Sequence, residues 1–130
     1  MERTEDSEEL GELVEKALEE KYRDQNIEED RIQAEREKKT TFLEDNLQKI
    51  IDKYREKSGE QGGNWISVRY LLGSENESEN RTVGRALTTL HEISQVYEKL
   101  EVDVWNSKSS RNKYNIKLVE QLEEFQEKYL

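Results

Sequence analysis

Residues 80–90 read NRTVGRALTTL, and this stretch decides the fold of the second half of the chain. Its apolar residues recur at i, i+3, i+4 and i+7, the spacing of one buried helix face: Val83, Ala86, Leu87 and Leu90. At about 100° per residue, the opposite face carries polar residues: Arg81, Arg85, Thr88, Thr89 and Glu92. The spacing therefore predicts a helix that buries one side and presents two arginines, one turn apart, on the other.

On the C-terminal side of this helix the apolar pattern changes to a period of two. The alternation predicts two β-strands, near residues 100–105 and 114–118. The polar stretch 106–112 between them predicts a hairpin with a basic tip. Helical spacing then returns at Leu118, Leu122, Phe125 and Tyr129. We therefore expect a last helix that packs on the first helix of the domain or on a second subunit.

On the N-terminal side, the sequence predicts a helix over residues 42–57. Thr41 followed by Glu44 has the spacing of a capping box, which marks the start of a helix. Apolar residues with helical spacing follow it: Leu43, Leu47, Ile50, Ile51 and Tyr54. A short strand at residues 65–66 and a brief helix that ends at Gly73 complete the pattern.

Residues 1–40 differ in composition from the rest of the chain, and we expect them to form an acidic arm outside the domain. The arm begins with an amphipathic helix, whose apolar stripe is Leu10, Leu13, Val14, Ala17 and Leu18. Residues 22–41 contain few apolar side chains, which indicates a solvated connector. The chain is thus divided into an arm, 1–40, and a domain, 41–130. Because the apolar stripe of the arm needs a surface to cover it, we expect a homodimer.

Charge and composition argue against several classes of protein. Only 32% of the residues are apolar and 40% are charged, so a core cannot run through the whole length. The net charge of −10 argues against a chain that coats nucleic acid non-specifically. Residues 80–117 nevertheless hold seven basic and four acidic side chains, a local charge of +3. No stretch approaches the roughly 18 apolar residues of a membrane span. We expect a cytoplasmic protein without a membrane partner, nucleoid-associated in a prokaryote.

The sequence offers no catalytic constellation. It has no Cys, and its single His, His91, has no Ser, Asp or metal-ligand arrangement around it in the sequence. We therefore expect neither an enzyme nor a bound metal or cofactor. The aromatic residues Trp65, Tyr70 and Trp105 are interpreted as core or sheet-face residues, not as stacking platforms for bases.

The order of helix, short strand, short helix, longer helix, hairpin and helix resembles the winged helix-turn-helix superfamily, from Thr41 to Leu118. The stretch TVGRALTTL, residues 82–90, is similar to its recognition helix. The expected fold class is mainly α with a small β-hairpin (α+β), carried behind the N-terminal acidic helical arm. The resemblance implies that the helix near 80–92 enters the major groove of double-stranded DNA, while a wing near 106–113 contacts the backbone.

The resemblance implies a sequence-specific DNA-binding protein, a transcriptional regulator. Its expected DNA-binding residues are Arg81, Thr82, Arg85, Thr88, Thr89, Lys108, Arg111 and Lys113. Arginine can pair with guanine or phosphate, and threonine can contact phosphate or a thymine methyl group. One alternative stays open, a protein–protein interaction adaptor that uses the same fold and whose acidic arm binds a basic partner. The acidic balance of the domain favours this alternative.

Overall fold

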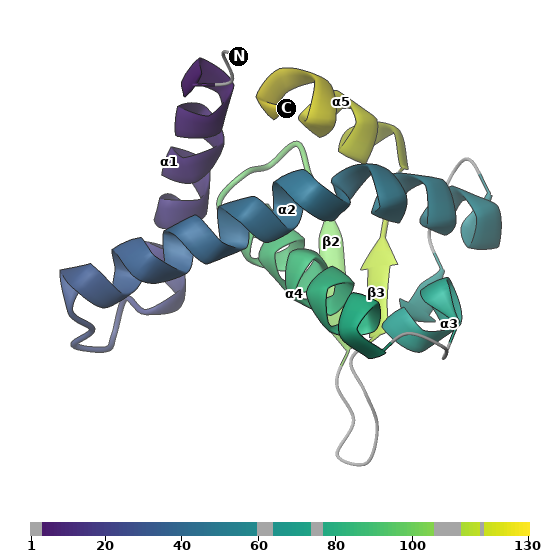
Figure 1. The fold of residues 1–130 in the computed structure, drawn as a ribbon, viewed down its shortest axis with the longest axis horizontal. Coiled ribbons are helices and arrows are strands. Elements are labelled where there is room, and N and C mark those ends of the chain that lie inside the picture. The colour runs from purple at the N-terminus through teal and green to yellow at the C-terminus, as the bar shows by residue number, and fades with distance from the viewer. Residues whose placement is uncertain (1–3, 60–63, 74–76, 106–112, 118) are drawn as a thin grey trace.

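In the computed structural model the described residues are 4–59, 64–73, 77–105, 113–117 and 119–130. They form five helices and three strands (Figure 1): α1 (Thr4–Lys21), α2 (Glu29–Ser58), β1 (Trp65–Ser67), α3 (Val68–Leu72), α4 (Glu77–Ser94), β2 (Val102–Trp105), β3 (Lys113–Ile116) and α5 (Val119–Tyr129). The described chain is mainly helical with a small antiparallel sheet, which confirms the predicted α+β class. Each helix in these ranges is too short or too polar to cross a lipid bilayer.

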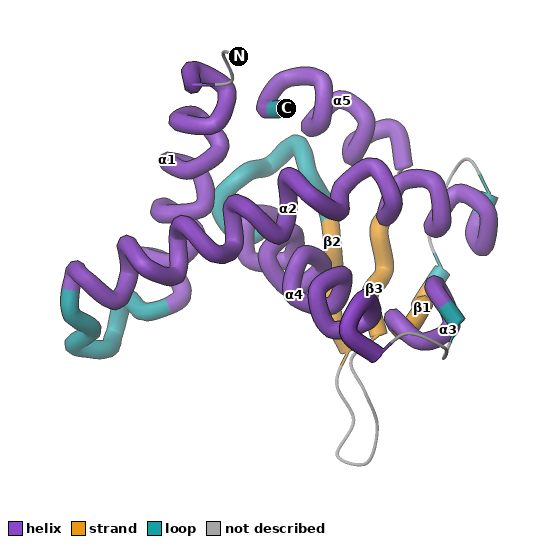
Figure 2. Tube along the Cα trace, viewed as in Figure 1, coloured by secondary structure: helices purple, strands orange, loops and turns teal. Residues whose placement is uncertain are grey.

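β3 is the central strand of the sheet, because it pairs antiparallel with both β1 and β2 (Figure 2). Tyr114 lies opposite Ile66 on one side and Val104 on the other. Successive side chains of a strand point to opposite faces, so Lys113 lies on the face that Tyr114 does not occupy. The two strands predicted from the alternating pattern are confirmed as β2 and β3, and the tip between them, 106–112, lies outside the described residues.

α2 is the axis of the fold. α5 and most of α1 lie on one side of it, and α4 with the sheet lies on the other (Figure 1). These elements share one apolar core, whose largest fully buried side chains are Tyr54, Phe125, Leu10, Leu18, Leu43, Leu47, Ile50, Ile51, Leu87, Leu90, Ile93 and Leu100. Full burial of one such side chain stabilises the fold by about 1.5–3 kcal/mol, so the core dominates its stability.

Tyr54 joins α2 to the sheet. Its hydroxyl donates to the backbone carbonyl of Asn64 and accepts the backbone N–H of Ile116, at 3.1 Å. The Tyr54 side chain is fully buried, so these bonds replace the water that its hydroxyl cannot reach. They hold the residue before β1 and the last residue of β3 against α2.

The predicted start of a helix at residue 42 is wrong. α2 begins at Glu29 and continues through Thr41 to Ser58, so residues 40 and 41, where the sequence was divided, are neighbours within one helix. The Thr41 hydroxyl donates to the carbonyl of Glu37 at 3.0 Å, a bond that a threonine makes from inside a helix. The capping-box spacing at Thr41 therefore arose by chance within a longer helix.

The apolar stripe of α1 is buried by the chain itself, contrary to the expectation of a separate arm. Its five residues, from Leu10 to Leu18, are each at least nine-tenths buried, and α1 packs on α2, α4 and α5. The chain reverses through residues 22–28, where Ile27 is partly buried, and this turn brings α1 back onto α2 (Figure 1). The stripe therefore gives no argument for a second subunit.

α5 packs on α2 and α1, in agreement with the predicted packing on the first helix of the domain. Its Phe125 and Tyr129 form an aromatic cluster with Tyr97, with ring centroids 5.0 to 5.9 Å apart. Leu118, the first residue of the predicted stripe, lies outside the described residues. Like α1, α5 buries its apolar face within the chain.

Candidate nucleic-acid interface

As far as Thr88, α4 has the two faces that its sequence predicts. Val83, Ala86, Leu87, Leu90 and Ile93 are buried against the core. Arg81 and Arg85 are exposed on the other side. In the part of the chain that the structure describes, neither arginine has an ion pair with a carboxylate. Both charges are therefore available to an anionic ligand.

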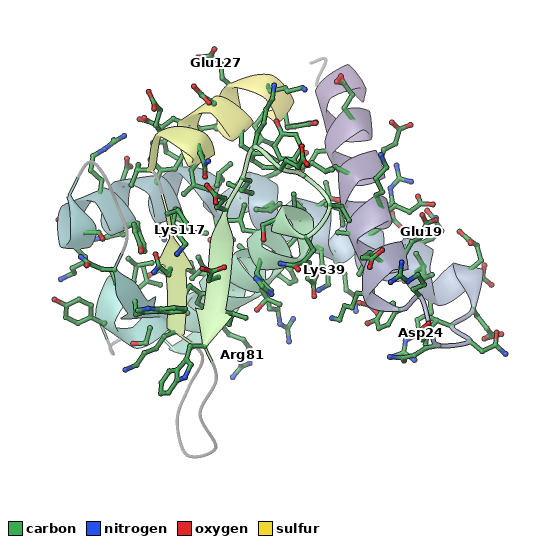
Figure 3. All side chains as sticks on the ribbon, turned by 180° about the vertical axis from the view of Figure 1, so that it is seen from behind. Glu19, Asp24, Lys39, Arg81, Lys117 and Glu127 are labelled. Atoms are coloured by element: carbon green, nitrogen blue, oxygen red, sulfur yellow. The ribbon has the colours of Figure 1, made fainter. Side chains whose placement is uncertain are left out.

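A groove of about 550 Å³ runs between α2 and α4. Residues of both helices and of β3 line it: Glu35, Lys38, Lys39, Phe42, Asn80, Arg81, Gly84, Arg85, Thr88 and Tyr114. Four of these residues are basic and one is acidic. The labelled Lys39 and Arg81 locate its two helices in Figure 3, where the acidic Glu19, Asp24 and Glu127 lie toward the periphery, away from Arg81.

Arg85 is oriented by an aromatic ring on the opposite helix. Its guanidinium carbon lies 5.4 Å from the centre of the Phe42 ring, which is within the range of a cation–π contact. This contact restrains the Arg85 side chain, so less conformational entropy is lost when its N–H groups bind an anion. Phe42 belongs to the partly buried residues that pack against the core, and the restraint is therefore anchored in the fold.

The three threonines of α4 differ in accessibility. Thr89 was expected to contact a ligand, but it is 0% exposed and its hydroxyl donates to the Arg85 carbonyl at 2.9 Å. That expectation is wrong, because α1 and α2 pack closely enough on α4 to cover more than its apolar stripe. Thr82 and Thr88 are partly exposed, and the Thr88 hydroxyl lies 2.8 Å from that of Tyr114.

Glu92 was expected on the exposed face of α4, and this expectation is also wrong. Only 8% of it is exposed, and its two carboxylate oxygens each lie 2.8 Å from an ammonium group, on Lys21 of α1 and on Lys39 of α2. Burial by itself would lower the pKa of Lys21, but the hydrogen bond and the charge of Glu92 raise the pKa above its usual value of 10.5. The Glu92 clamp, formed by Glu92, Lys21 and Lys39, thus ties the C-terminal half of α4 to α1 and α2.

Lys113 of β3 does not line the groove; it lies on the sheet face opposite to Tyr114, and its ammonium lies 5.3 Å from the centre of the Trp105 ring. Lys108 and Arg111, the other basic residues expected in the wing, lie outside the described residues. Trp65 and Trp105 are each 48% exposed and Tyr70 is 61% exposed, so these rings are not core residues. Trp65 and Trp105 are sheet residues, in agreement with the expectation of sheet-face aromatics, whereas Tyr70 belongs to α3.

Lys38, Lys39 and Phe42 were not identified from the sequence as site residues. A signal for them exists, because Glu35, Lys38, Lys39 and Phe42 follow the spacing i, i+3, i+4 and i+7 of one helix face. The sequence nevertheless indicates a connector, because the residues at this helical spacing are mostly charged, whereas a helix face that packs on a core has apolar residues. A helix that lines a cationic groove produces this pattern.

His91 has a structural role in this fold. Its Nδ1 lies 2.8 Å from the backbone carbonyl of Val102, a contact that joins α4 to β2. Among the described residues, no group of three or more His, Asp and Glu side chains is arranged to hold a metal ion. Comparison of the chain with protein families, with curated proteins and with solved structures finds no match.

Proposed function

We propose that this chain is a sequence-specific double-stranded DNA-binding protein of the winged helix-turn-helix type, acting as a transcriptional regulator. The order α2, β1, α3, α4, β2, β3 supports this proposal, as does a sheet in which β3 lies between β1 and β2. In such a fold α4 is the helix that enters the major groove, and the hairpin between β2 and β3 is the wing.

One observation carries the proposal. In a chain with a net charge of −10, the groove between α2 and α4 is lined by three basic side chains without acidic partners in the described residues: Lys38, Arg81 and Arg85. Unpaired cations gathered on one face favour binding of a polyanion, since each phosphate they neutralise releases a counterion. The acidic surface elsewhere disfavours contacts outside this face.

The geometry limits how much of α4 could meet DNA. Thr89 is buried and the Glu92 carboxylate is held by two lysines, so the part of α4 that lines the groove runs from Asn80 to Thr88. Arg81 and Arg85 lie one turn apart there. Arg81 could pair with guanine in the major groove, and Arg85 could pair with guanine or with a backbone phosphate. We propose that Lys113, with Lys108 and Arg111, contacts the backbone from the wing.

The test is a binding titration of the full chain against pooled random duplex and against a duplex selected from that pool, at several salt concentrations. The proposal expects an affinity that falls as salt rises and a selected duplex that binds at least about 10³-fold more tightly than the pool. Equal affinity for both duplexes would leave only non-specific binding. Absence of binding at low salt would contradict the proposal altogether.

The exposed aromatic residues favour a second candidate, a protein–protein interaction adaptor. Trp65, Tyr70 and Trp105 are exposed in a highly polar chain, and tryptophan and tyrosine are enriched at the energetic centres of protein interfaces. For this function the duplex titration would be flat. The homodimer expected from the sequence also remains a prediction, which sedimentation of the full chain would test.

A further inference from the structure

Two adjacent lysines of α2 have different environments in the groove. Lys39 is partly buried and its ammonium is held by Glu92 at 2.8 Å. Lys38 is exposed, and no carboxylate in the described part of the chain pairs with it. Both lysines line the groove with Arg85. The Glu92 clamp fixes this part of α2 against α4. Lys38 is thereby held in the groove with the arginines, while its own positive charge stays unpaired among the described residues.

Glu35, the one carboxylate among the described residues that line the groove, has partners outside it. Glu35 accepts hydrogen bonds from the Tyr22 hydroxyl, at 2.9 and 3.1 Å, and lies 3.8 Å from the guanidinium of Arg31. Its negative charge is thus partly neutralised by a contact outside the groove. The groove therefore presents Lys38, Arg81 and Arg85 with little competition from its own acid.

We propose that this groove is a phosphodiester-binding site in which Lys38 on α2 and Arg85 on α4 act on the same strand of a nucleic-acid backbone. Arg85 is already restrained by Phe42, and an arginine fork with a lysine point charge suits phosphate oxygens. Two cations from two helices, in an open groove, match an extended anion that passes between them. The surface that contacts duplex thus continues from α4 onto α2. That the bound nucleic acid is duplex DNA rests on the proposed function.

The test uses the full chain and its selected duplex and compares Lys38→Gln with Lys99→Gln. Each variant removes one charge from an exposed lysine, and Lys99 lies before β2, at the opposite end of that strand from the hairpin. We expect Lys38→Gln to reduce the slope of log affinity against log salt by about 0.9 and to weaken all sequences similarly. Lys99→Gln should retain the wild-type slope. Equal slopes for wild type and both variants would overturn the proposal.

A second arm separates this proposal from the proposed function. Inorganic phosphate is titrated into the ¹⁵N-labelled chain without duplex, and amide shifts are followed in wild type and Lys38→Gln. Shifts near residues 38 and 85 that weaken in the variant support the phosphate site, even if the wild type binds no duplex. Shifts that do not depend on Lys38, or none up to high phosphate concentration, count against it, and circular dichroism verifies that the variant folds.

Discussion

The two halves of α4 carry side chains at the same helical spacing and yet have opposite environments. Arg81, Arg85, Thr88 and Glu92 follow i, i+4, i+7 and i+11, so the helix itself places them on one face. The first three line an open groove, whereas Glu92 is buried in its clamp with two lysines. The difference comes from Lys21 at the end of α1 and Lys39 of α2, whose ammonium groups bind the Glu92 carboxylate in the second half of α4. Packing by distant residues, not the local pattern, decides which part of a helix face can bind a ligand.

The largest effect is expected from removing the charges of the open half. Arg81→Ala combined with Arg85→Ala should abolish specific duplex binding, because loss of a base-reading arginine costs about 1–3 kcal/mol and loss of Arg85 also removes a contact to the backbone. The fold should persist, since both side chains point away from the core. A gel-shift titration measures the effect, with Lys16→Ala combined with Lys99→Ala as the control that removes two exposed charges. Unchanged binding by the arginine variant would exclude α4 as the reading helix.

A smaller effect is expected in the buried half. Glu92→Ala leaves the ammonium groups of Lys21 and Lys39 facing each other without their acceptor, and it should lower the free energy of unfolding by about 1–3 kcal/mol. Urea unfolding at pH 7 measures this. The exposed pair of Asp103 and Lys117, 3.1 Å apart, provides the control, because Asp103→Ala should cost no more than about 1 kcal/mol. Equal costs for the two variants would mean that burial of Glu92 has no energetic consequence.

Three groups with raised pKa values predict how stability depends on pH. The pKa of Lys21 is raised in the folded chain, and burial raises the pKa of Tyr22 and of Tyr129 above 10.0. The folded state therefore holds these protons more tightly than the unfolded state, so their contribution is complete below pH 10 and is lost as pH rises beyond it. Urea midpoints measured from pH 8 to 11 should fall at the alkaline end, and less steeply in Glu92→Gln. A urea midpoint that increases as the pH is raised above 10 would contradict the predicted direction of this pH dependence.

The sequence predicted α4, the two strands of the hairpin and α5 because each buries residues at a regular period, as Val83 and Leu87 do. It could not predict that Thr89 and Glu92 are covered, since their burial depends on residues far away in the chain. The helix start predicted at Thr41 is wrong because a threonine inside a helix, with its hydroxyl bonded to a helix carbonyl, cannot be distinguished by sequence from an N-cap threonine. Lys38 could not be identified as a site residue because the helix face to which it belongs is charged, and helix faces are recognised in a sequence by their apolar residues.

The smallest effect is expected at Gly84, which lines the open groove within α4. A Cβ at this position would lie 3.6 Å from Cγ2 of Val68, an ordinary van der Waals contact. Gly84→Ala should therefore raise the free energy of unfolding by about 0.5–1 kcal/mol, through the lower conformational entropy of alanine in the unfolded chain. Thermal unfolding checks the direction. A lower melting temperature would show that the groove wall cannot accept a methyl group.

The most direct test of the central claim compares the two halves of α4 in one experiment. Selected duplex is added to the ¹⁵N-labelled chain, and the amide resonances of residues 80–94 are followed. If the open half is the binding surface, amides from Asn80 to Thr88 should shift strongly and those from Thr89 to Ser94 should change little. Shifts confined to β1 and β2, around Trp65 and Trp105, with α4 unchanged along its whole length, would contradict the account.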